Sequence, residues 1–401
     1  MARLGIGVGR RRGPGGPIPV PAPAAAAPAG FAGNGATNMR LKAMLARVAG
    51  GTGRGRIVFK GDSTTAGAGA GSPESEQQLA GARANRTSAV LASLLSRQGY
   101  PALDGSVVGD NGCKGYAALP AYDPRVTLSP PGGWSPSGGQ AFAGGNYLYT
   151  DGGGSFGFAP GGIVDRFEIV AFNVGGTLTM LVDDAAPATL VAPGASVAGN
   201  SVAVPASNDG FTRIIATAAS AGPREVRVSA GGVAILRSIT AYHGGTAAID
   251  VLNHASNGAG TADQAATGYH WSNRDSLAFD APDLTVINLG LNDIGNRVPV
   301  ATYAAGLRSI IAAARLSGDV LLVFPHPAGE QFANDVAAYR DAASSVAAGE
   351  GIAFFSLFDY FGGAFTPALR ARMADGLVHG DAGFYAEVAE LYRRCIAAMS
   401  A

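Results

Sequence analysis

A short stretch at residues 57–67 (IVFKGDSTTAG) constrains the fold more than any other part of the chain. Its first residues are β-branched and aromatic, which predicts a buried strand that ends abruptly at Gly61-Asp62-Ser63. Glycines and small residues follow, so another backbone or a ligand could approach Ser63 closely. Because open α/β sheets bind ligands beyond the carboxyl ends of their strands, a nucleophile would be well placed there. Taken alone, the tripeptide is equally consistent with an ordinary turn after a strand.

The segments on either side of this strand complete one strand–helix unit. Residues 39–48 (MRLKAMLARV) predict a short helix that leads into the strand, and residues 75–98 predict a second helix. The second helix has an apolar stripe at helical spacing, and Gly99 is a suitable stop signal. This stripe consists of Val90, Leu91, Leu94 and Leu95.

Residues 101–245 follow a different pattern, with no convincing amphipathic helix. Short alternating runs stand between clusters of glycine, proline and aspartate, for example at 167–172, 177–182, 211–215 and 225–228. This spacing predicts an antiparallel β-sandwich of jelly-roll type. Because an α/β pattern resumes afterwards, we expect the sandwich to interrupt the α/β domain.

Aromatic residues gather in the glycine-rich beginning of this region. Such side chains could stack on sugar rings, although aromatics in a β-sandwich more often belong to its core. They are Trp134, Phe142, Tyr147, Tyr149 and Phe156.

The α/β pattern resumes at residue 246. Apolar strands are predicted at 248–252, 284–289, 320–324 and 352–357. Helices are expected between and after them, and nearly continuous apolar strands alternating with helices predict a parallel sheet covered on both faces. The expected helices are one at 300–316 that buries Tyr303, Leu307, Ile310, Ile311 and Ala314, one bearing Phe332, Val336 and Tyr339, and a last one from Ala382.

The predicted organisation therefore has one discontinuous domain, one insertion and one arm. The arm combines an arginine run with proline- and alanine-rich sequence, which is a poor secretory signal and predicts low-complexity chain. The predicted boundaries are 1–38 for the arm, 39–100 and 246–401 for the α/β domain, and 101–245 for the insertion.

Polar residues suited to nucleophilic chemistry follow the predicted strands. Ser63, Gly258 and Asn292 each come after a strand end, and a late loop adds Asp375 and His379. A serine hydroxyl needs a base, and the imidazole of His379 titrates near neutrality. Asp375 is the nearest carboxylate that could orient it. The backbone N–H groups of Ser63 and Gly258, with the Asn292 side-chain amide, would donate to an oxyanion.

These residues resemble the sequence blocks of the SGNH (GDSL-type) hydrolase family of serine esterases and lipases. The resemblance covers residues 56–100 and 246–401. It implies a three-layer, flavodoxin-like parallel sheet, with catalytic Ser63, Asp375 and His379 and an oxyanion hole of Ser63, Gly258 and Asn292. The matching blocks are 61–63 (GDS), 251–253 (VLN) followed by Gly258, 290–293 (GLND) and 375–384 (DGLVHGDAGF).

The last block departs from the family pattern. The family usually spaces this pair as DxxH, whereas one extra residue separates Asp375 from His379 here. On one helical turn Asp375 could still reach His379, but in an extended loop it would lie more than about 10 Å away. Asp381 or a backbone carbonyl could then serve instead. Another stretch, 109–115 (GDNGCKG), could pass for the second block, but Gly258 follows a clearer strand.

The resemblance implies ester hydrolysis through an acyl-enzyme, on acetylated carbohydrates, lipids, thioesters or aryl esters. An inserted β-sandwich is typical of members that remove O-acetyl groups from polysaccharides, so an acetylated polysaccharide is the expected substrate, and a phage tail or extracellular setting would suit it. The alternatives are a lipase or acyltransferase with the same triad, or an inactive carbohydrate-binding protein. His254 and His326 lie near strand ends and could contact substrate.

Composition limits the remaining classes of partner. Lysine plus arginine equals aspartate plus glutamate, at 29 each, which argues against a nucleic-acid partner. No apolar run is long enough to span a membrane. The two cysteines, Cys113 and Cys395, are far apart, and without a Cys/His ligand pattern we expect no metal, cofactor or disulfide framework. The oligomeric state is left open.

Overall fold

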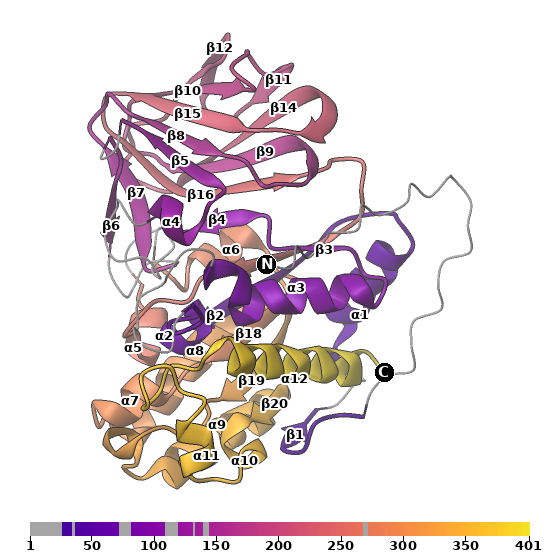
Figure 1. Cartoon of the computed structure of the whole chain (residues 1–401), viewed down its shortest axis with the longest axis vertical. Helices are drawn as coiled ribbons and strands as arrows, with labels where there is room; N and C mark the ends of the chain where they lie inside the picture. Colours follow the sequence, from indigo (N-terminus) through magenta and orange to yellow (C-terminus); the bar gives the residue numbers. More distant parts are fainter. Residues whose placement is uncertain are drawn as a thin grey trace, which may run out of the picture.

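The α/β part of the molecule is built on one seven-stranded sheet (Figure 1). The computed structural model describes residues 26–33, 37–71, 82–108, 119–130, 133–138, 144–267 and 272–401. The strand order is β1-β20-β19-β18-β2-β17-β3, parallel throughout except that β1 runs antiparallel to β20. The strands are β1 Phe31–Ala32, β2 Gly55–Gly61, β3 Ala102–Leu103, β17 Ile249–Asn253, β18 Leu284–Asn288, β19 Asp319–Phe324 and β20 Ala353–Ser356.

This strand order determines where a ligand can bind. Taken in chain order, β2, β17, β18, β19 and β20 stand as 2-1-3-4-5, the flavodoxin-like arrangement. β17 lies on one side of β2 and β18 on the other, so the chain crosses over β2 between β17 and β18 and the strand order reverses there. At such a switch point a crevice opens beyond the carboxyl ends of the strands.

Helices cover both faces of the sheet because the strands are apolar on both faces. Alternate residues of a strand point to opposite sides, so Ile57 and Phe59 of β2 join one hydrophobic cluster and Val58 joins the other. The first cluster includes α1 (Met39–Ala49), α3 (Thr87–Arg97) and α12 (Ala382–Ser400), and the second includes α8 (Val300–Arg315) and α9 (Val336–Glu350). The result is three layers (Figure 1).

Three expectations need correction. The helix predicted at 75–98 begins only at Thr87, because Arg86 is extended and residues 82–85 form a 3₁₀ turn; the residues before 82 lie outside the described ranges. Phe332, which was predicted on the same helix as Val336 and Tyr339, lies in a separate 3₁₀ turn. The left-handed backbone of Asp335, at φ 45°, ends the helical conformation before α9 begins. Part of the predicted arm also belongs to the fold, because its residues 31–32 form β1, which pairs with β20.

Two antiparallel sheets lie between β3 and β17 in the chain and form the upper part of Figure 1. Strand β10 alternates buried and half-buried residues, as expected for a sheet with one covered face. Both sheets contribute to one hydrophobic cluster, which contains Met180 and Val228 from the first and Ile169 and Ile214 from the second. This shared cluster fits the expected β-rich region.

The strands of these sheets are short, with long β9, β14 and β16 at the centre of the second. The first sheet contains β12 Ser196–Ala198, β13 Ser201–Ala203, β10 Thr177–Val182, β15 Val226–Gly231, β8 Ser155–Phe158 and β5 Val126–Ser129; the second contains β11 Thr189–Val191, β14 Phe211–Pro223, β9 Ile163–Phe172, β16 Ala234–Tyr242, β7 Asn146–Thr150 and β6 Ser135–Gly138, with β4 Ser106–Val108 on β16.

The short helices occupy the loops of the chain. They are α2 Ser63–Ala66, α4 Leu119–Tyr122, α5 Thr261–Gln264, α6 Ser276–Asp280, α7 Leu291–Gly295, α10 Leu357–Tyr360 and α11 Pro367–Arg370, with 3₁₀ turns at Ala82–Asn85 and Glu330–Phe332.

The aromatic residues expected to be able to stack on sugars are mainly core residues. Trp134 and Phe156 are 1% and 0% exposed and pack edge to face. Tyr147 and Tyr149 are half-buried, and Phe142 lies outside the described residues. Burial removes Trp134 and Phe156 from the surface that a glycan could reach.

A buried polar cluster joins the two parts of the molecule. Arg237 on β16 forms an ion pair with Asp280 on α6, and both side chains are almost fully buried. Lys60, on the same face of β2 as Val58, is completely buried and donates to the carbonyl oxygen of Asn273 at 2.5 Å. Burial lowers the pKa of Lys60 to about 7, with Arg237 acting in the same direction and Asp280 opposing it.

Lys60 should make the stability of the protein depend on alkaline pH. Its pKa is lowered on folding, so between about pH 7 and 10 the unfolded chain holds one more proton than the folded one. The free energy of unfolding should therefore rise with pH by up to about 1.4 kcal/mol per unit, and Lys60→Met should remove this rise. Urea unfolding at pH 7, 8 and 9 measures the free energy of unfolding of both proteins. If it changed equally with pH in wild type and Lys60→Met, the lowered pKa of Lys60 would be contradicted.

Candidate active site

Ser63 lies at the carboxyl end of β2 and begins the short helix α2. Asp62 caps this helix, since its side chain accepts from the backbone N–H and the hydroxyl of Thr64, at 2.9 and 2.7 Å. Gly61 leaves room for the turn, because a Cβ there would lie 2.2 Å from the Thr65 hydroxyl and 2.8 Å from the Asn288 carbonyl. The turn leaves Ser63 partly exposed while its neighbours are buried.

The structure brings the late loop onto Ser63. His379 Nε2 lies 2.8 Å from Ser63 Oγ, and His379 Nδ1 lies 2.8 Å from Asp375 Oδ2. The other carboxylate oxygen of Asp375 accepts from the backbone N–H groups of Leu377, Val378 and His379, at 2.9, 2.9 and 3.1 Å. The loop thus curls around the carboxylate, which accommodates the extra residue between Asp375 and His379.

Asp381, the alternative carboxylate, has a different contact. Its side chain caps the last helix by accepting from the backbone N–H of Phe384 at 2.7 Å. The carboxylate within hydrogen-bond reach of His379 is therefore that of Asp375.

The hydrogen bonds in this loop favour the ionised form of Asp375. Burial by itself would raise the pKa of this carboxyl, but the hydrogen bond from His379 and those from the Val378 and Leu377 backbone outweigh it. The pKa of Asp375 is therefore held well below its usual range. A carboxylate that stays charged can orient the imidazole and stabilise its protonated form.

Gly258 and Asn292 lie on the loops after β17 and β18, the two neighbours of β2. Gly258 has φ 75°, a left-handed conformation that favours glycine. The side-chain amide of Asn292 donates to the carbonyl oxygen of Ala259 at 3.0 Å, which ties it to the residue after Gly258. Because the amide has two N–H donors, the second can serve another acceptor.

The side chains of Asp293, Thr261 and Gln264 also hold these loops together, through contacts that the sequence pattern did not predict. Asp293 accepts from the backbone N–H of Thr261 at 3.1 Å and from its hydroxyl at 2.6 Å. Gln264 donates to the carbonyl oxygen of Gly61 at 3.2 Å, and the backbone N–H of Ser256 donates to the same oxygen at 3.0 Å. Asp293 was visible within the GLND block, but its partner lies 32 residues away in the chain.

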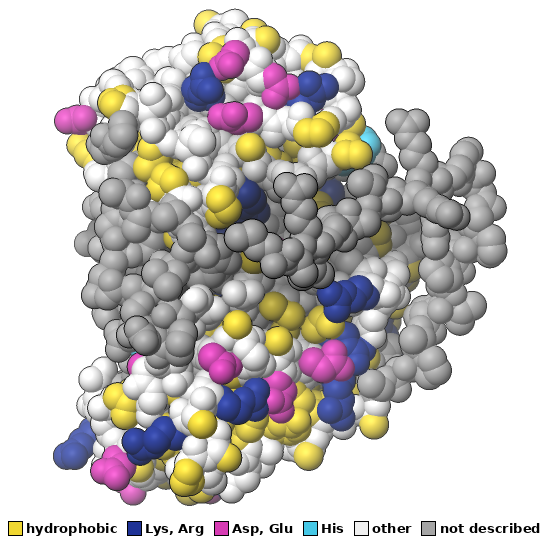
Figure 2. All heavy atoms as spheres, in the orientation of Figure 1, with side chains coloured by type: hydrophobic (Ala, Val, Ile, Leu, Met, Phe, Trp, Pro, Cys, Tyr) yellow, Lys and Arg dark blue, Asp and Glu magenta, His cyan; other side chains and the backbone are white. Residues whose placement is uncertain are grey.

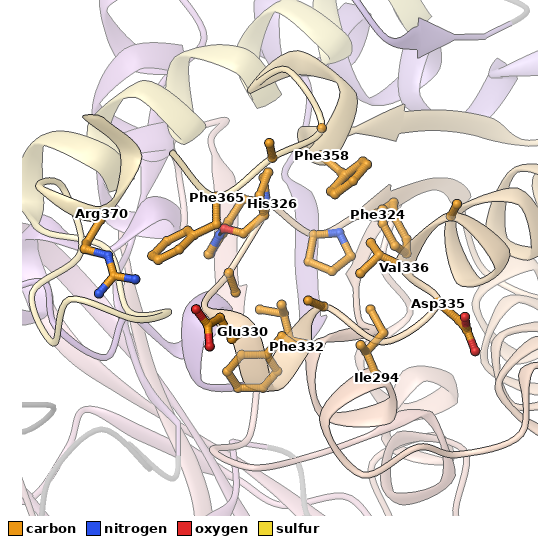
Figure 3. A pocket seen from close by; sticks show the side chains of 18 residues that line it. Ile294, Phe324, His326, Glu330, Phe332, Asp335, Val336, Phe358, Phe365 and Arg370 are labelled. Atoms are coloured by element: carbon orange, nitrogen blue, oxygen red, sulfur yellow. Dashed lines mark hydrogen bonds between the residues drawn. The ribbon is translucent and has the colours of Figure 1, made fainter. Parts of the chain in front are cut away.

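A cavity of about 450 Å³ lies next to these loops (Figure 3). His326 is one of the residues that line this cavity and is 3% exposed. Its Nδ1 lies 2.8 Å from the carbonyl oxygen of Pro327. Burial lowers the pKa of His326 to about 4, so its imidazole is neutral at pH 7. His254, the other histidine near a strand end, is completely buried with Nδ1 3.4 Å from Asp280.

Metal binding and membrane crossing by a helix find no support among the described residues. Within the described ranges no group of His, Cys, Asp and Glu side chains is arranged to hold a metal ion. None of the described helices combines the length and apolarity that crossing a bilayer requires.

Cys395 is a buried free thiol, while Cys113 and the 109–115 stretch lie outside the described residues. Figure 2 shows basic and acidic side chains interspersed on the face in view.

Comparison with known proteins agrees with the fold and with the family resemblance. The model of the GDSL-like lipase/acylhydrolase family matches residues 217–386. A solved structure titled "Peptidoglycan O-acetylesterase in action, 5 min" is 20% identical, covers 90% of this chain and 95% of its own, and superposes with a TM-score of 0.63. This likeness extends over the α/β part and the antiparallel sheets.

Two other solved structures show lower similarity. A carbohydrate esterase family 2 enzyme with a carbohydrate-binding domain from Corynascus thermopiles (Myceliophthora fergusii) is 12% identical, with 68% and 99% of the two chains covered and a TM-score of 0.29. A carbohydrate esterase family 3 enzyme from Talaromyces cellulolyticus is 15% identical, with 36% and 69% covered and a TM-score of 0.29. No curated protein matches the sequence.

The charged Asp375 carboxylate should stabilise the folded chain in a pH-dependent way. Because folding lowers its pKa, its contribution is present above about pH 4, the unfolded value, and is lost as pH falls through the folded value. Asp375→Asn should therefore lower the unfolding midpoint in urea at pH 7, and the difference from wild type should narrow below pH 4. A difference that stays constant from pH 7 to pH 3 would contradict this account.

Proposed function

The chain carries a hydrolase domain of the GDSL-like lipase/acylhydrolase family, and from this premise we propose that it is a serine esterase. The observation that carries the proposal is the hydrogen-bonded series from Asp375 through His379 to Ser63, with 2.8 Å at both links. It contains a nucleophile, a base and a carboxylate that orients the base.

The proposed reaction proceeds through an acyl-enzyme. Ser63 Oγ attacks the ester carbonyl carbon while His379 Nε2 takes the hydroxyl proton, and Asp375 stabilises the resulting imidazolium. The carbonyl oxygen becomes an oxyanion that accepts from the Ser63 and Gly258 backbone N–H groups and from the Asn292 amide. The intermediate collapses, and the alcohol leaves with the proton held by His379. Water, activated by the same imidazole, then releases the acid and restores Ser63.

The substrate that we propose is an O-acetylated polysaccharide. The relative titled as a peptidoglycan O-acetylesterase supports this, because it is aligned over 90% of this chain and therefore also over the antiparallel sheets. A lipase or an acyltransferase with the same catalytic residues is the second candidate. Acetylated surface glycans lie outside the cell, so we place the activity in an extracellular or virion-associated setting.

The same proposal divides the chain into functional parts. We assign residues 39–100 and 246–401 to the hydrolase domain and residues 101–245 to an inserted β-sandwich of jelly-roll type, with residues 1–38 as an arm. The parallel pairing of β2 with β17 across the intervening antiparallel sheets supports an insertion. Strand β3 still pairs with β17, so the hydrolase sheet extends to Leu103 and the predicted boundary at residue 100 lies slightly too early.

Ser63→Ala should abolish ester hydrolysis without changing the fold, because it removes the nucleophile and only one oxygen atom. Acetyl release from a panel of acetylated glycans, run beside short and long nitrophenyl esters, measures the activity. Ser317→Ala, at the opposite end of the sheet, is the matched control and should keep full turnover. Equal turnover by wild type and Ser63→Ala, with matching circular dichroism, would refute the assignment.

Asn292→Ala should lower kcat by about 10²–10³ with a smaller change in KM, because a lost oxyanion donor acts mainly in the transition state. Steady-state kinetics on nitrophenyl acetate separates the two constants. If KM alone rose, Asn292 would bind the ground state instead. Circular dichroism of the variant checks the fold, since the amide also bonds to Ala259.

A further inference from the structure

The cavity of Figure 3 lies directly beside the proposed catalytic loops. Two of its wall residues, Leu291 and Ala328, pack in one cluster with Val378. Leu291 precedes Asn292 in the chain and Val378 precedes His379. In addition, the backbone N–H of Gly329 donates to the carbonyl oxygen of Leu377 at 2.9 Å, which joins the loop after β19 to the loop that carries His379.

Aromatic side chains form much of the cavity wall. Phe332, Phe358 and Phe365 come from three different segments, line the cavity in Figure 3 and are all half-buried. They contrast with Trp134 and Phe156 in the antiparallel sheets, which are buried in a core. Half-buried aromatic surface therefore lies next to the site of the proposed reaction, in addition to Tyr147 and Tyr149 in the antiparallel sheets.

Polar groups stand at one end of this cavity. Figure 3 shows Arg370 and Glu330 at that end, and both residues are exposed. The Arg370 guanidinium lies 5.3 Å from the ring centroid of Phe365, and among the described residues neither Arg370 nor Glu330 has an ion-pair partner. The cavity thus offers aromatic surface together with a donor, the Arg370 guanidinium, and an acceptor, the Glu330 carboxylate.

We propose that this cavity is a subsite for a sugar ring next to the acetylated sugar of a glycan, an inference that rests on the proposed function. Sugar hydroxyls both donate and accept, so one ring can satisfy Arg370 and Glu330 while its apolar face lies against Phe365. An acyl chain at the same place could pack on the apolar wall but would make no hydrogen bond to either charged group. The volume of about 450 Å³ is also far larger than an acetyl group requires.

The test compares acetylated oligosaccharides of increasing length with nitrophenyl acetate, using wild type, Phe365→Leu, Phe365→Tyr and Arg370→Ala. For Phe365→Leu, kcat/KM on the longer oligosaccharides should fall about tenfold more than on nitrophenyl acetate, mainly through KM. Phe365→Tyr keeps an aromatic ring and should retain the dependence on length. Arg370→Ala should lose part of the dependence of kcat/KM on oligosaccharide length. The control Arg308→Ala, on the exposed side of α8, should show the same dependence as wild type.

Two results would overturn the subsite. One is equal loss on oligosaccharides and nitrophenyl acetate in Phe365→Leu. The other is a difference between Phe365→Leu and wild type in their preference among nitrophenyl esters of increasing acyl length. Such a difference would mean that the cavity binds the acyl chain. If wild type hydrolyses no ester, the proposed function fails separately. Calorimetric binding of an unacetylated oligosaccharide to Ser63→Ala, with and without Phe365→Leu, then still decides the subsite, since equal affinities would refute it.

Discussion

The position of β2 between β17 and β18 is the constraint on which the proposed site depends. Parallel pairing aligns the carboxyl ends of the three strands at one edge of the sheet, so the loops carrying Ser63, Gly258 and Asn292 must leave side by side. Those loops are then bound to one another, since the carbonyl oxygen of Gly61 accepts from both Ser256 and Gln264. In the proposed oxyanion hole such contacts would hold the donors in place before substrate arrives, as electrostatic stabilisation of an oxyanion requires.

The antiparallel sheets are connected to this arrangement through buried polar groups. Arg237 reaches across from β16 to Asp280, and the backbone N–H of Gly144 donates to the carbonyl oxygen of His254 at 3.2 Å. His254 in turn stands at the start of the loop that contains Gly258. The antiparallel region therefore contacts a loop of the candidate site.

Much of this organisation could be predicted from sequence because it depends on local pattern. Apolar runs placed β2, β17, β18, β19 and β20 within one or two residues of their observed ends, and helical spacing identified the buried face of α8. The short blocks around Ser63 and Asn292 named residues that the structure places on neighbouring loops. The start of α3 and the position of Phe332 were wrong, because extended or left-handed backbone at Arg86 and Asp335 interrupts an otherwise helical pattern.

The sequence by itself determined which residues could do chemistry and in what order the strands and helices come. Only the tertiary structure decided that Asp375 meets His379 despite the extra residue, because backbone N–H groups fold the loop around its carboxylate. It also decided that Trp134 is a core residue while Phe365 faces a cavity. Both outcomes depend on contacts between segments far apart in the chain, and a local sequence pattern carries no record of such contacts.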